Sequence, residues 1–213
     1  MKKNILYLIL AFMFAIIPAV AAAASTEELE YTKATYIEAG STKTSTDEAW
    51  FNPKTNDFRS DYALDPSNKN FSSNYVLKNG TKIVNITRNR KGKAISGTYT
   101  TKDAKFAKGW VKSMKASSFA SIKAEYQSFN WKKIGTVKEN GKTLTKLSGS
   151  AKKIDNFIQY AYIDSDTGLP VKVENYSIKN KKKELTATSL YEYKQVSDKG
   201  IFDTSSVKLK KVS

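Results

Sequence analysis

The chain has 213 residues, with 36 lysines and arginines against 20 aspartates and glutamates, and it contains neither cysteine nor histidine. Those two residue types supply many of the bases, nucleophiles and metal ligands of enzymes, so their absence disfavours catalysis. The net charge of +16 favours polyanionic partners. Only Arg59, Arg88 and Arg90 are arginines. Nucleic acid is therefore not expected, because its phosphates and bases are recognised mainly by guanidinium groups.

The first 24 residues have the pattern of a signal peptide. Lys2 and Lys3 precede an apolar run of 13 residues, Ile5–Ile17, and the small residues Ala22–Ala24 follow. The run is shorter than the about 20 apolar residues that a membrane-spanning helix needs. We therefore expect cleavage near Ala24 and a secreted, extracytoplasmic protein of the cell envelope, with an uncleaved N-terminal anchor as the alternative. Export without cysteine is typical of a bacterial protein.

Alternating apolar and polar residues predict strands through the first half of the chain. Asn79-Gly80 is a strong hairpin signal within this half, because both residues tolerate positive φ. The predicted strands are Leu29–Glu38, Thr44–Phe51, Phe58–Leu64, Tyr75–Lys78, Lys82–Thr87 and Ala94–Thr100.

A helical segment, Asp103–Phe129, interrupts the strands. One arc of it carries Phe106, Ala107, Trp110, Val111 and Met114, and the opposite arc carries Lys105, Lys108, Lys112 and Lys115. Ser117-Ser118 breaks the pattern and predicts a second short helix with Phe119, Ile122 and Tyr126. We expect the apolar arc to pack on the sheet, with cavity lining and insertion into a membrane surface as alternatives.

Strands resume after the helical segment, over Lys132–Val137, Thr143–Leu147, Asn156–Ile163, Val171–Ser177 and Leu185–Tyr193. The total of about ten or eleven strands is more than a flat open sheet holds without curling. The predicted fold class is α+β: a large curved antiparallel sheet, or half-barrel, covered by a helical lid. Residues 25–213 are expected to form a single domain.

Several segments resemble the LolA-like group of outer-membrane lipoprotein carrier proteins and their relatives, which include regulators of envelope stress. The similar segments are Glu48–Pro53, Phe58–Tyr62, Lys78–Lys82 and Asp164–Glu174. The resemblance implies an antiparallel half-barrel whose concave side is covered by helices and binds acyl chains or a lipidated partner.

The residues expected to line such a cavity are Phe58, Arg59, Tyr62, Phe106, Trp110, Met114, Tyr160 and Tyr162. Tyrosines two apart in a strand share one face, and outward-facing cross-strand pairs are the alternative for Tyr160 and Tyr162. Alternation places Arg59 on the face opposite Phe58 and Tyr62, which favours solvent exposure of Arg59. The other interpretation is that Arg59 holds a lid carbonyl or a ligand acid from within.

Metal binding and catalysis have weak signals. Asp164-x-Asp166-x-Gly168 is similar to the beginning of a calcium loop, but the downstream glutamate is missing, and a hairpin turn explains these residues. Serines and lysines are too numerous for any Ser–Lys pair to stand out. We expect no catalytic residue, no metal site and no cofactor.

The sequence favours a non-enzymatic protein that binds a lipid or another amphiphilic or hydrophobic ligand between sheet and helix. The alternative is an envelope interaction or sensor protein that docks another protein, or an anionic wall polymer, without a small ligand. Removing Lys2 and Lys3 leaves 34 basic residues against 20 acidic ones, a net charge of +14. Anionic cell-wall polymers or a membrane surface are therefore candidate partners, and the protein is expected to be a monomer.

Overall fold

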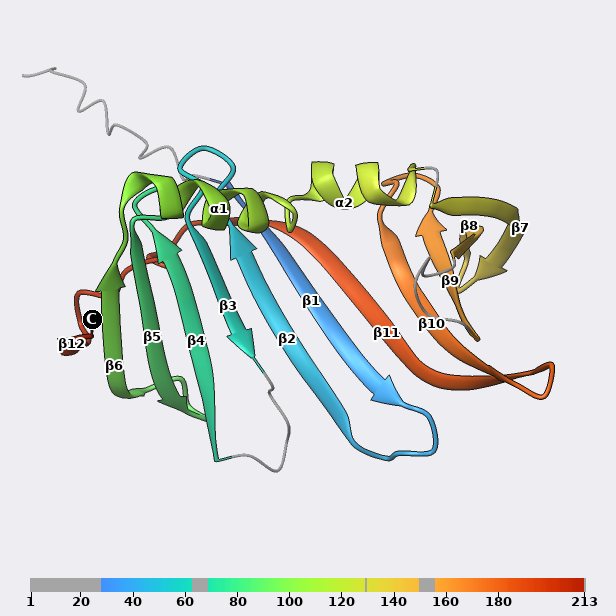
Figure 1. The fold of residues 1–213 in the computed structure, drawn as a ribbon, viewed down its shortest axis with the longest axis horizontal. Helices are drawn as coiled ribbons and strands as arrows, with labels where there is room; N and C mark the ends of the chain where they lie inside the picture. The colour runs from blue at the N-terminus through green and yellow to red at the C-terminus, as the bar shows by residue number, and fades with distance from the viewer. Residues whose placement is uncertain (1–27, 63–68, 129, 150–155, 213) are drawn as a thin grey trace, which may run out of the picture.

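The computed structural model describes residues 28–62, 69–128, 130–149 and 156–212. The predicted signal peptide, residues 1–24, lies outside the described residues. Figure 1 shows one large sheet with two helices lying across it. The strands are β1 (Glu28–Glu38), β2 (Thr44–Phe51), β3 (Phe58–Tyr62), β4 (Asn70–Leu77), β5 (Lys82–Asn89), β6 (Ala94–Thr101), β7 (Trp131–Glu139), β8 (Lys142–Gly149), β9 (Phe157–Asp164), β10 (Pro170–Lys179), β11 (Lys182–Ser197) and β12 (Leu209–Lys211).

The sheet consists of two hairpin series joined along one seam. Its order is β12-β6-β5-β4-β3-β2-β1-β11-β10-β9-β8-β7. Strands β1 to β6 form one half and β7 to β11 the other, and β1 pairs with β11 over the full eleven residues of β1. All pairs are antiparallel except β12 with β6. The predicted curved α+β sheet is confirmed, with twelve strands in the described part of the chain instead of ten or eleven.

The two helices connect the halves. Strands β6 and β7 lie near opposite edges of the sheet, so the chain between them must cross the sheet, and it does so as α1 (Ala104–Lys115) and α2 (Phe119–Tyr126). Asp103 and Ser118 are the N-caps: each side chain accepts a hydrogen bond from a backbone N–H of its first turn. The predicted division at Ser117-Ser118 is confirmed. Neither helix is long and apolar enough to cross a membrane.

Both faces of the sheet are partly covered, each by a different segment. We call the face under α1 and α2 the helix face, and the opposite face, under residues 198–212, the tail face. On the tail face, Phe202, Val207 and Leu209 pack against a core from β4 and β5 whose members are Tyr75, Leu77, Val84 and Ile86. In Figure 1 this C-terminal segment passes behind the sheet while α1 lies in front of it.

The helix face has two cores, one in each half. Phe51, Phe58 and Val76 form the core of the β2–β4 region, with Met114 of α1 packed on it. Leu147, Ala161, Ile163 and Val173 form the core of the β8–β10 region, with Tyr126 of α2 packed on it. Helix α1 therefore packs on the first half and the end of α2 on the second, while α2 begins at the seam, where the N–H of Phe119 donates to Glu30 of β1 at 2.8 Å.

Candidate functional site

Helix α1 rests on the sheet by a narrow stripe. Ala107 is its single buried residue, and it touches the turn between β4 and β5, where Gly80 has a φ of +85°. A Cβ on Gly80 would lie 2.8 Å from the carbonyl oxygen of Ala107 and 3.0 Å from Cγ2 of Val111. The turn and the helix thus meet backbone to backbone. Together with Met114, these contacts occupy only one side of the helix.

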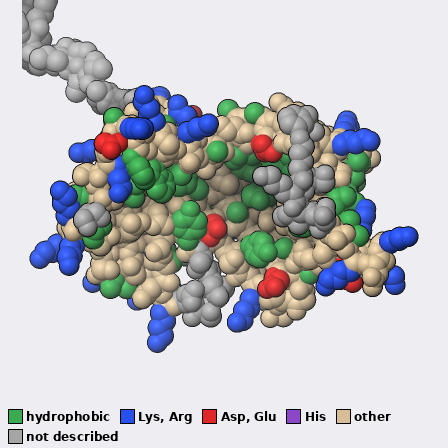
Figure 2. All heavy atoms as spheres, viewed as in Figure 1, with side chains coloured by type: hydrophobic (Ala, Val, Ile, Leu, Met, Phe, Trp, Pro, Cys, Tyr) green, Lys and Arg blue, Asp and Glu red, His purple; other side chains and the backbone are tan. Residues whose placement is uncertain are grey.

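The aromatic residues of α1 lie beside that stripe and remain accessible. Phe106 is 51% exposed and Trp110 is 37% exposed, and their ring centroids are 6.4 Å apart. They border a hollow of about 630 Å³ whose other described lining residues are Asp103, Lys105, Gly109 and Ser113. Figure 2 shows hydrophobic side chains gathered beside a depression on this side of the molecule. The prediction that the whole apolar arc packs on the sheet is wrong for these two aromatic residues.

Beyond the core of the β2–β4 region, the helix face carries one mostly polar row without charge, while Glu30 and Asp47 lie elsewhere on that face by register. One row of residues in register across five strands consists of Asn85, Asn74, Ser60, Ala49 and Thr32. Ser60 is 4% exposed, and its Oγ has no hydrogen-bond partner in the described part of the chain. A buried hydroxyl without a partner is energetically costly. This row therefore offers donors and acceptors to a bound group while carrying no charge.

The opposite flank of α1 is basic. A second hollow, of about 420 Å³, lies between the helix and the β4–β5 turn. Its described lining residues are Asn79, Thr81, Ala104, Ala107, Lys108, Val111, Lys112 and Lys115. Helix α1 thus separates an aromatic hollow from a lysine-lined one.

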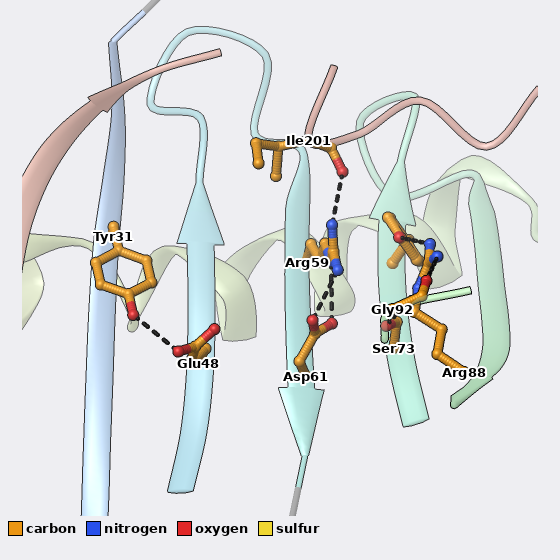
Figure 3. A network of polar contacts seen from close by, with 9 residues as sticks. Tyr31, Glu48, Arg59, Asp61, Ser73, Arg88, Gly92 and Ile201 are labelled. Atoms are coloured by element: carbon orange, nitrogen blue, oxygen red, sulfur yellow. Dashed lines mark hydrogen bonds and ion pairs between the residues drawn. The ribbon is translucent and has the colours of Figure 1, made fainter. Parts of the chain in front are cut away.

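Arg59 lies on the tail face. Its side chain is mostly buried, so the favoured prediction of solvent exposure is wrong. Its side chain is 16% exposed and Asp61 is 6% exposed, and Nη2 of Arg59 is 2.7 Å from Oδ2 of Asp61. Arg59 also donates to the carbonyl oxygen of Ile201, 3.4 Å away, and its guanidinium lies 4.8 Å from the ring centroid of Trp50. Figure 3 shows this network on the side of the sheet away from α1. Arg59 therefore holds the C-terminal segment and does not face the aromatic hollow.

A second arginine extends the same network. Arg88 donates to Oγ of Ser73 at 3.0 Å, to the hydroxyl of Tyr75 at 2.7 Å and to the carbonyl oxygen of Gly92 at 2.8 Å. In the neighbouring strands, the hydroxyl of Tyr31 donates to Glu48 at 3.0 Å. These contacts satisfy buried polar groups on the tail face, and they are structural.

Tyr160 and Tyr162 also lie on the tail face. They alternate along β9 with Ala161 and Ile163, which belong to the helix-face core. The hydroxyl of Tyr162 donates to Glu174 at 2.8 Å, and Nζ of Lys172 lies 4.2 Å from its ring centroid. Burial, reinforced by the Glu174 carboxylate, raises the pKa of the Tyr162 phenol above its ordinary value. The outward-facing alternative therefore describes these two tyrosines.

The tyrosines that do face the helices are Tyr191 and Tyr193 of β11. Phe119 of α2 meets Tyr193 edge to face, with ring centroids 5.4 Å apart, and Tyr126 packs with Trp131 and Tyr191. Burial raises the pKa values of the Tyr126 and Tyr193 phenols. The sequence shows that Tyr191 and Tyr193 share a face, but only the pairing of β11 with β1 shows which face it is.

The calcium-like motif forms a hairpin turn, as the sequence predicts. Oδ1 of Asp164 accepts hydrogen bonds from the backbone N–H groups of Asp166 and Thr167, at 3.0 and 3.3 Å. Its Oδ2 is 2.8 Å from Nζ of Lys142, and this hydrogen bond holds the pKa of the Asp164 carboxyl below its usual value. Within the described ranges, no cluster of three or more acidic residues is arranged to hold a metal ion.

The predicted site residues thus divide into four groups. Phe58 and Met114 meet in the core beneath α1, and Phe106 and Trp110 line the adjacent hollow. Tyr62 lies at the end of β3, 47% exposed, on the same face as Phe58. Arg59, Tyr160 and Tyr162 lie on the opposite face.

The fold is an open, curved antiparallel sheet with two helices across one face, which is the α+β half-barrel architecture. No protein-family model and no curated protein matches the sequence. Solved structures of similar fold include a LolA superfamily protein from Nitrosomonas europaea, with 8% identity, a TM-score of 0.29 and coverage of 82% of this chain and 88% of that chain. The solved structures that match thus include a member of the LolA superfamily, the group that the sequence resembles.

Two further structures show how the lengths compare. The Pseudomonas aeruginosa MucA/MucB complex matches with 17% identity and a TM-score of 0.43. That match covers 84% of this chain but 56% of the other, so this chain spans little more than half of the longer protein. An uncharacterised conserved protein from Thermus thermophilus matches with 11% identity and a TM-score of 0.46, over 85% of this chain and 90% of that chain. At these identities the likeness concerns the fold alone.

Proposed function

We propose that this chain is a secreted, non-enzymatic protein of the cell envelope that binds a lipid or another amphiphilic or hydrophobic ligand beside α1. The observation that carries the proposal is the exposed pair Phe106 and Trp110 at a hollow of about 630 Å³. Ligand sites commonly have volumes of about 300–1,000 Å³ and a mostly apolar lining. The proposal includes removal of residues 1–24 as a signal peptide and a single domain over residues 25–213.

The arrangement around the hollow suits a molecule with an apolar chain and a polar end. Phe106 and Trp110 supply aromatic surface, and burying either against a ligand would contribute roughly 1.5–3 kcal/mol. Asp103, Lys105 and Ser113 supply polar groups among the described lining of the same hollow. The same arrangement is what the sequence resemblance to the LolA-like group implies.

The test is ligand retention by purified protein. Native mass spectrometry followed by solvent extraction should detect a co-purified amphiphile, and the double variant Phe106→Ser/Trp110→Ser should lose it. The matched control is Ile134→Ser on β7, because Ile134 is 49% exposed but lies at the other edge of the sheet. Equal retention by the double variant and the control would refute the site.

The lysine excess favours a second candidate, an interaction or sensor protein that docks another protein or an anionic wall polymer without a small ligand. Of the seven ion pairs within the described residues, none involves Lys105, Lys108, Lys112 or Lys115 of α1. Unpaired exposed cations attract polyanions. Repeatedly empty wild-type protein in the extraction experiment would support this candidate over ligand binding.

A further inference from the structure

Helix α1 presents a continuous exposed arc with different chemistry at its two edges. At 100° per residue, the small residues Gly109 and Ser113 occupy the middle of the arc. Phe106 and Trp110 follow on one side, between that middle and the stripe that packs on the sheet. Lysines occupy the other side. The two hollows follow this division, because one is lined by the aromatic residues and the other by Lys108, Lys112 and Lys115.

The charge of this arc is strongly one-sided. Lys105, Lys108, Lys112 and Lys115 are all exposed, and the first turn of α1 contains no acidic residue. The nearest acidic residue along the chain, Asp103, is the N-cap, and its Oδ1 accepts a hydrogen bond from the N–H of Phe106 at 2.8 Å. Nζ of Lys102 lies 5.2 Å from the ring centroid of Phe106. Cations therefore flank the aromatic pair from both directions along the chain.

We propose that α1 docks the protein onto the surface of an anionic lipid bilayer, with Phe106 and Trp110 entering the interface and the lysines contacting the headgroups. Amphipathic helices with lysines on one side and Trp or Phe on the other bind membranes in this way. Trp rings also prefer the headgroup level. The docking goes beyond the proposed function, because it requires no ligand in the hollow.

The chemistry favours a bilayer over a wall polymer as the occupant of this arc. A soluble polyanion would contact the lysines but would leave Phe106 and Trp110 in water. An anionic bilayer satisfies both halves of the arc at once. The position of α1 is also suitable, because Figure 1 shows the helix along one rim of the sheet, across the ends of several strands.

The test compares binding of the protein to two kinds of vesicle, one of phosphatidylcholine alone and one with about 30 mol% phosphatidylglycerol, by co-sedimentation. The variant Lys108→Gln/Lys112→Gln/Lys115→Gln removes three charges from α1. The matched control, Lys132→Gln/Lys133→Gln/Lys138→Gln, removes three exposed charges from β7 at the far edge of the sheet. Both variants have the same net charge, so non-specific attraction changes equally in the two.

We expect the wild type to prefer the anionic vesicles and the α1 variant to bind them about 100-fold more weakly, which corresponds to about 1 kcal/mol for each lysine. The β7 variant should stay within a fewfold of the wild type. Equal losses in the two variants, or equal binding of the wild type to both kinds of vesicle, would overturn the proposal.

A second comparison separates docking from ligand binding. Phe106→Ser/Trp110→Ser should weaken vesicle binding, whereas Ile134→Ser should not. The α1 lysine variant should keep any co-purified amphiphile while losing vesicle binding. If the α1 lysine variant retains the amphiphile and still binds anionic vesicles as the wild type does, the docking proposal is refuted and the ligand-binding proposal is supported. If the wild type is empty yet binds anionic vesicles in the lysine-dependent way, docking stands and ligand binding fails.

Discussion

Arg59 shows how a residue assigned from strand alternation can have a different role in the folded chain. Alternation correctly places it opposite Phe58, and an arginine on an outer face is usually solvated. The C-terminal segment covers that face, however, and the carbonyl oxygen of Ile201 accepts a hydrogen bond from the guanidinium. The covering segment is 142 residues away in sequence. Local pattern cannot reveal such a contact.

Arg59→Met should destabilise the protein by about 3 kcal/mol, because it leaves the Asp61 carboxylate buried without its partner. Arg59→Met/Asp61→Leu should cost less than the single change, since no unpaired charge remains. Urea denaturation measures both. The control is Lys33→Met, which breaks the ion pair between Lys33 and Glu192. These side chains are 33% and 51% exposed, so the loss should be at most about 1 kcal/mol. If Arg59→Met costs no more than Lys33→Met, the network in Figure 3 does not hold the tail.

Among the helices and strands, the segments with a strong period are mostly predicted well from the sequence. The helical segment and its break at Ser117-Ser118 are found because N-capping residues and 3.6-residue periodicity act locally. Strand β4 begins at Asn70, five residues before the predicted start, because Asn70–Asn74 is mostly polar and its pairing with β5 supplies the stability. Strand β12 has only three residues and no readable period.

The packing side of α1 is predicted only in part. The apolar arc spans five residues, but the sheet contacts Ala107, Val111 and Met114 and leaves the aromatic pair at the edge. The reason is the close approach at Gly80, which brings small residues of the helix against the β4–β5 turn. A hydrophobic arc gives the general direction of a helix but not which residues within the arc make the contact.

Gly80→Ala tests this contact between turn and helix. The added Cβ meets the Ala107 carbonyl at 2.8 Å and is also strained at a φ of +85°, so we expect a loss of about 2–3 kcal/mol. Gly40→Ala is the matched control, because Gly40 has a φ of +77° but nothing within 4 Å of the new Cβ. It should cost about 1 kcal/mol from backbone strain alone. Equal melting temperatures for the two variants would mean that α1 is not seated on the turn.

For the whole molecule, the sequence supports an α+β half-barrel but not the coverage of both its faces. Hairpin signals such as Asn79-Gly80 fix neighbouring strands, and a long series of hairpins implies a large sheet. The pairing of β1 with β11 and the return of the tail across β4–β6 depend on contacts between distant segments. For that reason periodicity identifies the aromatic pair of α1 and places Arg59 opposite Phe58, but it cannot show that Tyr160 and Tyr162 lie on the face away from the helices.

Leu209→Ala tests whether the tail-face core stabilises the molecule as a whole. Leu209 packs on the core from β4 and β5 and pairs with Gly97 of β6, where an added Cβ would lie 2.6 Å from Cδ2 of Leu209. We expect a loss of about 2 kcal/mol in the free energy of unfolding. Val212→Ala is the control, because Val212 is 40% exposed, and it should change stability by less than about 0.5 kcal/mol. Equivalent denaturation midpoints would show that the tail is peripheral.

The seam between β1 and β11 also constrains the order of folding. Glu28 pairs with Ser197, so β1 finds its second neighbour in the sheet only after residue 197 has emerged from the ribosome. Until then β1 presents an open edge, which is prone to pairing with the wrong partner. Contacts across such long sequence separations also slow folding. The sheet should therefore close late, after synthesis of β11. Until then, keeping the chain apart from other copies would reduce wrong pairing at the edge of β1.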